Sequence, residues 1–258
     1  MSESDKGGSK GGGPKGPIKD SLRPPLPKRF YENVARVPAA SGNGFEIQLD
    51  GRPLRTPLKR ILVIDDPAFA DLVVSEWRAQ SGVIDPATMP ATRLANSAID
   101  AVAGHRAAVA GEVVAYAGSD LLCYRTASPA NLVAEQCRTW DPIVDAVEAA
   151  IGARFMRAEG VMHVAQPPAV AARIATALDG LSDLQLAAVQ LITTLTGSTI
   201  LALAYAKGLL TADAVWKAAH LDEDWQIAHW GRDEEAEARR TANERDFRAA
   251  AAALAPSH

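Results

Sequence analysis

The spacing of apolar side chains divides the chain into a short part with strand periodicity and a long part with helical periodicity. Between residues 29 and 65, apolar and polar residues alternate along Phe45–Leu49, which is the period of a half-buried strand. Asp50-Gly51 follows directly and is a strong signal for a hairpin turn. Two prolines in the next segment cannot donate to a central ladder, so that segment is expected at a sheet edge.

From Pro67 onward the apolar positions recur at helical spacing. Asp66 is suited to cap a helix that begins at Pro67, and Gly82 is suited to stop it. Ser182 and Gln185 have the spacing of a capping box. A short strand or turn is expected near residues 154–162. Further helices are expected at about 90–103, 105–117, 129–151, 167–180, 182–206 and 211–250.

This order predicts an α+β fold, with a small β-rich N-terminal domain followed by a larger multihelical C-terminal domain. The expected boundaries are a disordered Gly/Lys/Pro-rich tail over residues 1–28, a β-rich domain with one or two helices over 29–105, and a helical domain over 106–258. Leu184–Ala206 is the most apolar stretch, but its threonines and glutamines favour a core helix, broken near Gly197, over a stable membrane span.

Charge is distributed unevenly along the 258 residues, whose net charge is −4. The first 29 residues carry a balance of +4, so the rest of the chain carries −8. An acidic body argues against nucleic acid as a partner. The N-terminal stretch has neither an apolar core nor an Arg-rich amphipathic period, so a bacterial cytoplasmic location is expected. The two cysteines, Cys123 and Cys137, lie in apolar surroundings and are expected to be unreactive buried thiols.

Searches for catalytic chemistry yield no positive pattern. The chain has no phosphate-binding loop, no Gly-x-Ser-x-Gly elbow and no metal-binding histidine pair. We therefore expect no catalytic, cofactor-binding or metal-binding residues and no enzymatic activity. A small-molecule enzyme with a site in the cleft between the two domains remains the alternative, because pockets often lie at such boundaries.

An acidic and tryptophan-rich segment near the C-terminus is the most distinctive local feature. Residues 213–237 hold eight acidic residues opposed by Lys217 and Arg232, and Trp216 lies among them. One interpretation is a solvated helix face whose tryptophans point into the core; the other is a docking surface with acidic rim and aromatic anchors. The candidate partner-binding residues are Asp213, Asp222, Glu223, Asp224, Trp225, Trp230, Glu234, Glu235 and Glu237.

Seven short motifs, in order, give the chain a family resemblance that spans about residues 29–250. They are Arg29-Phe30-Tyr31, Leu49 through Pro57, Glu76-Trp77, Met89 through Asn96, Asp120 through Arg125, Trp140-Asp141-Pro142, and Trp225-Gln226 with Trp230-Gly231. Together they resemble the assembly chaperones of the ATP synthase α subunit, a family of mitochondria and α-proteobacteria. For Arg52–Pro57 and Arg93–Asn96 a structural role is the favoured interpretation, with Arg93 and Asn96 as a polar clamp between domains.

The resemblance implies an ATP-independent, non-enzymatic chaperone without cofactor. Such a protein would hold the unassembled α subunit of the F1 complex until the β subunit replaces it. It also implies client contact on acidic residues of the helical domain, here the segment Asp213–Glu237. Eukaryotic relatives would act in the mitochondrial matrix.

Overall fold

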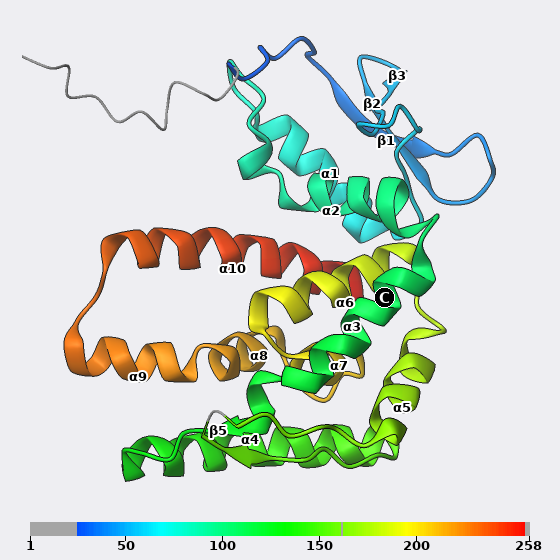
Figure 1. The fold of residues 1–258 in the computed structure, drawn as a ribbon. Helices are drawn as coiled ribbons and strands as arrows, with labels where there is room; N and C mark the ends of the chain where they lie inside the picture. Colours follow the sequence, from blue (N-terminus) through cyan, green and yellow to red (C-terminus); the bar gives the residue numbers. More distant parts are fainter. Residues whose placement is uncertain (1–24, 161, 256–258) are drawn as a thin grey trace, which may run out of the picture.

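The computed structural model describes residues 25–160 and 162–255, and Figure 1 shows a small sheet beside a larger group of helices. The sheet contains β1 (Val34–Pro38), β2 (Phe45–Leu49), β3 (Arg52–Pro53) and β4 (Val63–Ile64). All pairings are antiparallel: β1 lies against β2, and both β3 and β4 pair with β2. The expected strand region and the edge position of the proline-containing strand are thus confirmed.

The turn between β2 and β3 is formed by Asp50 and Gly51, as the sequence predicts. Both have positive φ, 48° and 76°, which suits the tight two-residue hairpin. The Asp50 carboxylate also accepts hydrogen bonds from the backbone N–H groups of Glu32 and Asn33. These bonds favour the ionised form and lower the pKa of Asp50, so the turn is tied to the chain that enters β1.

Between β3 and β4 the chain leaves the sheet edge and returns, forming what we call the edge loop, residues 54–62. The Leu62 N–H donates to the Leu54 carbonyl at 2.9 Å, and the Thr56 N–H donates to the Arg60 carbonyl at 2.9 Å. The loop is therefore a small hairpin of its own, with Lys59 at its turn in a left-handed conformation of φ 67°.

The first helix of the N-terminal half begins where its capping signal predicts, whereas the second has no side-chain cap. Asp66 accepts a hydrogen bond from the N–H of Phe69 and caps α1 (Pro67–Ala79); α2 (Pro90–Ser97) follows and continues into a π-helical turn, η3 (Ala98–Val102). The Glu76 carboxylate of α1 accepts hydrogen bonds from the N–H groups of Ala91 and Thr92, so it joins α1 to the start of α2. Burial raises the pKa of Glu76.

Eight further helices form the C-terminal half of the described chain. They are α3 (Arg106–Tyr116), α4 (Ala130–Ile151), α5 (Pro168–Leu178), α6 (Asp183–Thr196), α7 (Thr199–Ala206), α8 (Ala212–Ala219), α9 (Leu221–Trp230) and α10 (Glu234–Leu254). The expected strand near residue 158 is β6 (Ala158–Glu159), parallel to β5 (Tyr124–Arg125). Short 3₁₀ turns are η2 (Pro86–Thr88), η4 (Ala117–Ser119) and η5 (Leu121–Cys123).

The helical run expected over 211–250 is divided into three helices, because it contains its own stop and start signals. The α8–α9 junction lies at His220, and Gly231 with φ 90° ends α9. Asp233 accepts from the N–H of Ala236 at 2.8 Å and starts α10. Local caps therefore override a helical periodicity that is continuous in the sequence.

The apolar stretch Leu184–Ala206 is a broken core helix, as predicted. Gly197, with φ 65°, ends α6, and the Ser198 hydroxyl caps α7 by accepting from the N–H of Leu201. The buried Asp120 carboxylate accepts from the Ser198 hydroxyl at 2.7 Å and from the N–H of Ile200 at 2.9 Å. Across residues 25–160 and 162–255, no helix has the length and apolar character that crossing a membrane requires.

Helices α6 and α10 connect the two halves of the molecule. Figure 1 shows α10 running beside α6 beneath α1 and α2. An ion pair between Arg93 of α2 and Asp246 of α10 crosses this boundary, so the expected clamp forms through Arg93. Asn96 does not take part: the buried side-chain oxygen of Asn96 has no hydrogen-bond partner among the described residues.

The start of the described chain is paired with the body. The N–H of Ile84 donates to the Pro27 carbonyl at 2.8 Å, and Lys28 forms a β-bridge with Val83. Residues 27 and 28 therefore belong to the fold, although the sequence places them in a disordered tail. Residues 1–24 of that predicted tail lie outside the described residues.

Candidate functional site

The acidic and tryptophan-rich segment forms a helical hairpin in which α9 and α10 are joined by residues 231–233. Figure 1 shows α9 and α10 lying apart, with the segment that connects them at one side of the molecule. Between them lies a groove of about 490 Å³. Glu223, Asp224, Trp230 and Glu237 line the groove together with the apolar side chain of Ile227. We call this feature the hairpin groove.

Arg240 of α10 spans the hairpin groove and neutralises part of its charge. Its guanidinium lies 2.5 Å from the Asp224 carboxylate and 3.7 Å from that of Glu223. The hydrogen bond to Asp224 raises the pKa of Arg240. Because Arg240 lies outside residues 213–237, counting charges within that segment overestimates the acidity of the groove.

Other candidate residues have partners within the fold. Asp222 accepts a hydrogen bond from the side-chain amide of Gln136 on α4 at 2.8 Å. Asp213 of α8 does not line the groove, and it forms an ion pair with Arg248 of α10. The sequence treats these acids as one surface. In the structure Asp222 joins α9 to α4, whereas the Asp213 side chain is 83% exposed and forms a surface ion pair.

The first turn of α10 carries the acidic groups that remain available. Glu234 and Glu235 are exposed, and neither forms an ion pair with a described residue. Glu237 pairs with Arg232 at 2.7 Å across the turn. Carboxylates at a helix N-terminus interact favourably with the helix dipole, so Glu234 and Glu235 also stabilise α10.

The three tryptophans have different environments. Trp216 is buried and packs against Phe247 with ring centroids 5.1 Å apart, so it belongs to the core. The Trp230 side chain is 75% exposed at the end of α9. Trp225 stacks on His229 at 3.8 Å and meets Trp230 edge to face at 5.5 Å. An exposed indole supported by two other rings is a preformed apolar anchor beside carboxylates.

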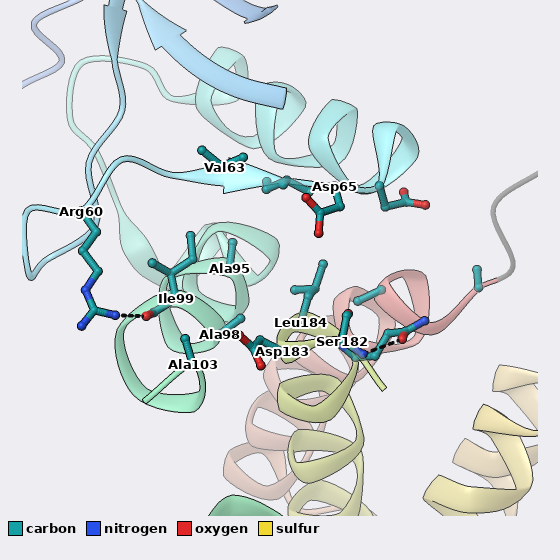
Figure 2. Close-up of a pocket in the computed structure, with 15 residues that line it drawn as sticks. Arg60, Val63, Asp65, Ala95, Ala98, Ile99, Ala103, Ser182, Asp183 and Leu184 are labelled. Atoms are coloured by element: carbon teal, nitrogen blue, oxygen red, sulfur yellow. Dashed lines mark hydrogen bonds between the residues drawn. The ribbon is translucent and has the colours of Figure 1, made fainter. Parts of the chain in front are cut away.

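A second cavity, also of about 490 Å³, lies between the two halves of the molecule, where the alternative interpretation places an enzyme site. Figure 2 shows its walls: β4 with Asp65, the π-helical turn with Ile99, and the start of α6. Two of its polar groups serve the fold: Arg60 donates to the Ile99 carbonyl, and Ser182 caps α6.

The chemistry of this inter-domain cavity gives the enzyme alternative no support. Histidine, cysteine and lysine are absent from its described lining. Within the part of the chain that the structure describes, no group of three or more His, Cys, Asp or Glu side chains is arranged to hold a metal ion. Cys137 is only partly buried, contrary to the expectation, whereas Cys123 is buried, and burial raises the pKa of Cys123 to about 12. Cys123 is a structural thiol, as predicted.

Comparison with known proteins identifies the relatives of this chain. Residues 28–148 match the family described as ATP12 chaperone protein. Mitochondrial atp12 of Schizosaccharomyces pombe is 26% identical over 228 residues, which cover 82% of this chain and 78% of that protein. The crystal structure of Atp12 from Paracoccus denitrificans has a TM-score of 0.80 at 38% identity, and the match covers 88% of this chain and 97% of that one. A proposed chaperone from Agrobacterium tumefaciens has a TM-score of 0.85 at 46% identity, over 92% and 90% of the two chains.

Proposed function

Because this chain belongs to the ATP12 chaperone family, we propose that it binds the unassembled α subunit of the F1 ATP synthase and promotes F1 assembly without using ATP. The observation that carries the proposal is the match to Atp12 of Paracoccus denitrificans along nearly the whole of both chains. The proposal places this action on the α subunit in the bacterial cytoplasm.

The physical task explains why a fold without a catalytic pair is sufficient. A subunit of a ring-shaped assembly exposes apolar surface before its neighbour arrives, and such surface promotes aggregation. A chaperone that covers this surface needs moderate affinity, so that the correct neighbour can displace it. An anchor surrounded by charged groups meets that requirement, since the charges accelerate encounter while the anchor supplies part of the affinity.

We assign client binding to the hairpin groove and the adjoining turn. Trp230 is the anchor in this proposal, because a 75% exposed indole has no role in the core. Glu234 and Glu235 supply the acidic rim, while Glu223, Asp224 and Glu237 line the groove. Asp222 contributes indirectly, because its hydrogen bond to Gln136 holds α9 against α4, and Asp213 on α8 lies outside this surface.

An aggregation assay with purified F1 α subunit tests this function. Wild-type protein, added in equimolar amount and without ATP, should keep the α subunit soluble. The variant Glu234→Gln/Glu235→Gln should capture the α subunit more slowly at low salt, and the difference should shrink near 0.5 M salt, where the Debye length is about 4 Å.

The matched control removes the same charge from another surface. Glu159→Gln/Asp179→Asn changes two exposed acids outside the hairpin and should behave as wild type. An equal loss of α-subunit capture in both variants would assign the effect to net charge and contradict the proposed acidic rim. Failure of the wild-type protein to keep the α subunit soluble would contradict the proposed function itself.

A further inference from the structure

The edge loop presents a basic surface that the hairpin groove does not explain. Arg55, Lys59 and Arg60 lie within it, and Arg52 immediately precedes it in β3. None of these four cations forms an ion pair with a residue that the structure describes, whereas nine other arginines do. Arginines without an ion pair occur elsewhere in the described chain as well, but here four unpaired cations lie within nine residues, from Arg52 to Arg60.

The loop is held in a fixed conformation by its own polar groups. Both oxygens of the Asp100 carboxylate are engaged: one accepts from the Thr56 hydroxyl at 2.7 Å, the other from the N–H of Leu58 at 3.0 Å. The guanidinium of Arg55 donates to the Lys59 carbonyl at 2.7 Å. Asp100 thus fixes the turn without pairing with any of the cations.

An apolar side chain is exposed at the turn between these cations. Leu58 is 64% exposed, and Ile61 on the returning strand is 39% exposed. A leucine that is not buried contributes nothing to the core, and the hydrogen bond on its own N–H keeps it in place. The edge loop therefore combines a fixed apolar contact with surrounding positive charge, as binding surfaces do.

We propose that the edge loop is a second client-binding surface, which recognises an acidic segment of the same client protein that occupies the hairpin groove. The inference rests on the proposed function. Carboxylates of the client would pair with Arg52 and Lys59, and an apolar client side chain would cover Leu58. Arg52 suits this role, because a guanidinium can bind a carboxylate through two hydrogen bonds.

Charge distribution favours a protein surface over other anions. Nucleic acid is a continuous polyanion, and the net charge of −8 on the chain after residue 29 would repel it. A membrane surface is disfavoured because stable anchoring needs more apolar area than Leu58 and Ile61 provide. A short acidic segment of a protein needs only Arg52, Lys59 and one apolar contact.

The two surfaces lie far apart on the molecule and have opposite charge. In Figure 1 the N-terminal sheet and the turn between α9 and α10 lie at opposite sides. A client that touches both is held at two points, which strengthens binding beyond either contact and fixes the orientation of the client. Release would then begin when a competing subunit displaces either contact.

Capture of purified F1 α subunit by matched charge variants tests the proposal. The loop variant is Arg52→Glu/Lys59→Glu, which leaves the hydrogen bonds of Thr56 and Leu58 to Asp100 in place. The control variant, Arg173→Glu/Lys207→Glu, makes the same change of charge at exposed positions on helical-half segments. The conservative variant is Arg52→Lys/Lys59→Arg. Wild-type protein is also tested for flotation with anionic vesicles of phosphatidylglycerol and phosphatidylcholine.

We expect the loop variant to melt as wild type does and to bind the α subunit at least about fivefold more weakly, with the control and conservative variants unchanged. A photoreactive benzoyl-phenylalanine in place of Leu58 should cross-link to peptides of the α subunit that carry net negative charge. If wild type captures the α subunit and the loop variant does so equally well, the second surface is refuted and the proposed function stands. If wild type captures nothing, both fail. Flotation with vesicles, or cross-links confined to basic peptides, would also overturn the proposal.

Discussion

At the residue scale, the tryptophans separate client binding from folding. Trp230→Ala should change the free energy of unfolding by less than about 0.5 kcal/mol, because the side chain is 75% exposed. Trp140 is fully buried, and its ring N–H donates to the Ala218 carbonyl at 2.9 Å, so Trp140→Ala should cost about 3–5 kcal/mol. Urea denaturation measures the free energy of unfolding of both variants. Loss of α-subunit capture in a normally folded Trp230 variant would support the anchor, and unchanged capture would refute it.

The buried Asp120 carboxyl makes stability depend on pH in a specific direction. Burial raises its pKa from 3.8 to about 6 in the folded protein. At a pH between 3.8 and about 6, Asp120 is mostly ionised in the unfolded chain but mostly protonated in the folded protein. The contribution of Asp120 to stability is therefore greatest below pH 3.8, falls as the pH rises, and levels off above about pH 6.

Replacing Asp120 by Asn tests this dependence. The variant lacks the titration, and its amide would face the N–H of Ile200, which now donates to the carboxylate. The unfolding free energy of wild type minus that of Asp120→Asn should fall by about 2 kcal/mol from pH 4 to pH 6. Urea denaturation at a series of pH values gives this difference. A difference that stays constant over the range would show that Asp120 does not titrate there.

At the element scale, contact between α2 and α10 fixes the N-terminal half on the helices. Arg93 and Asp246 form the charged part of this contact, with 44% and 22% of their side chains exposed. A double-mutant cycle with Arg93→Ala and Asp246→Ala should give a coupling energy of roughly 0.2–1 kcal/mol, reduced by salt. A larger, salt-insensitive coupling would mean that the pair is a principal source of cohesion between the halves, rather than an addition to apolar packing.

At the scale of the whole molecule, the ends of the folded body can be located by deletion. Removing residues 1–24 should shift the melting temperature by less than about 2 °C, because this Gly/Lys-rich stretch offers few apolar side chains to bury. Removing residues 1–28 also deletes the Pro27 carbonyl that bonds to Ile84 and the bridge from Lys28 to Val83. That deletion should lower the melting temperature by a further 2–4 °C or so, equivalent to about 1 kcal/mol. Differential scanning calorimetry of both truncations decides the boundary. Equal melting temperatures would show that these pairings do not contribute.

The sequence alone determined the order of elements and the chemistry of most turns and caps. Asp50-Gly51, Asp66 and the Ser182–Gln185 capping box act on atoms within a few residues, so their structural effect follows from local spacing. The apolar stretch around Gly197 was predictable for the same reason. The division of residues 211–250 was missed because periodicity hid the caps at Asp233 and Gly231.

Only the tertiary structure decided which residues of the candidate site are available to a partner. Arg240 and Arg248 come from α10 to neutralise acids that are unopposed in the local sequence. Trp216 and Trp230 lie in the same acidic segment of the sequence, yet Trp216 is in the core and Trp230 is 75% exposed. Charge compensation and burial depend on contacts between residues far apart in the chain. Hydrophobic periodicity indicates which face of a helix is apolar, but the packing of distant helices determines which side chains that face covers.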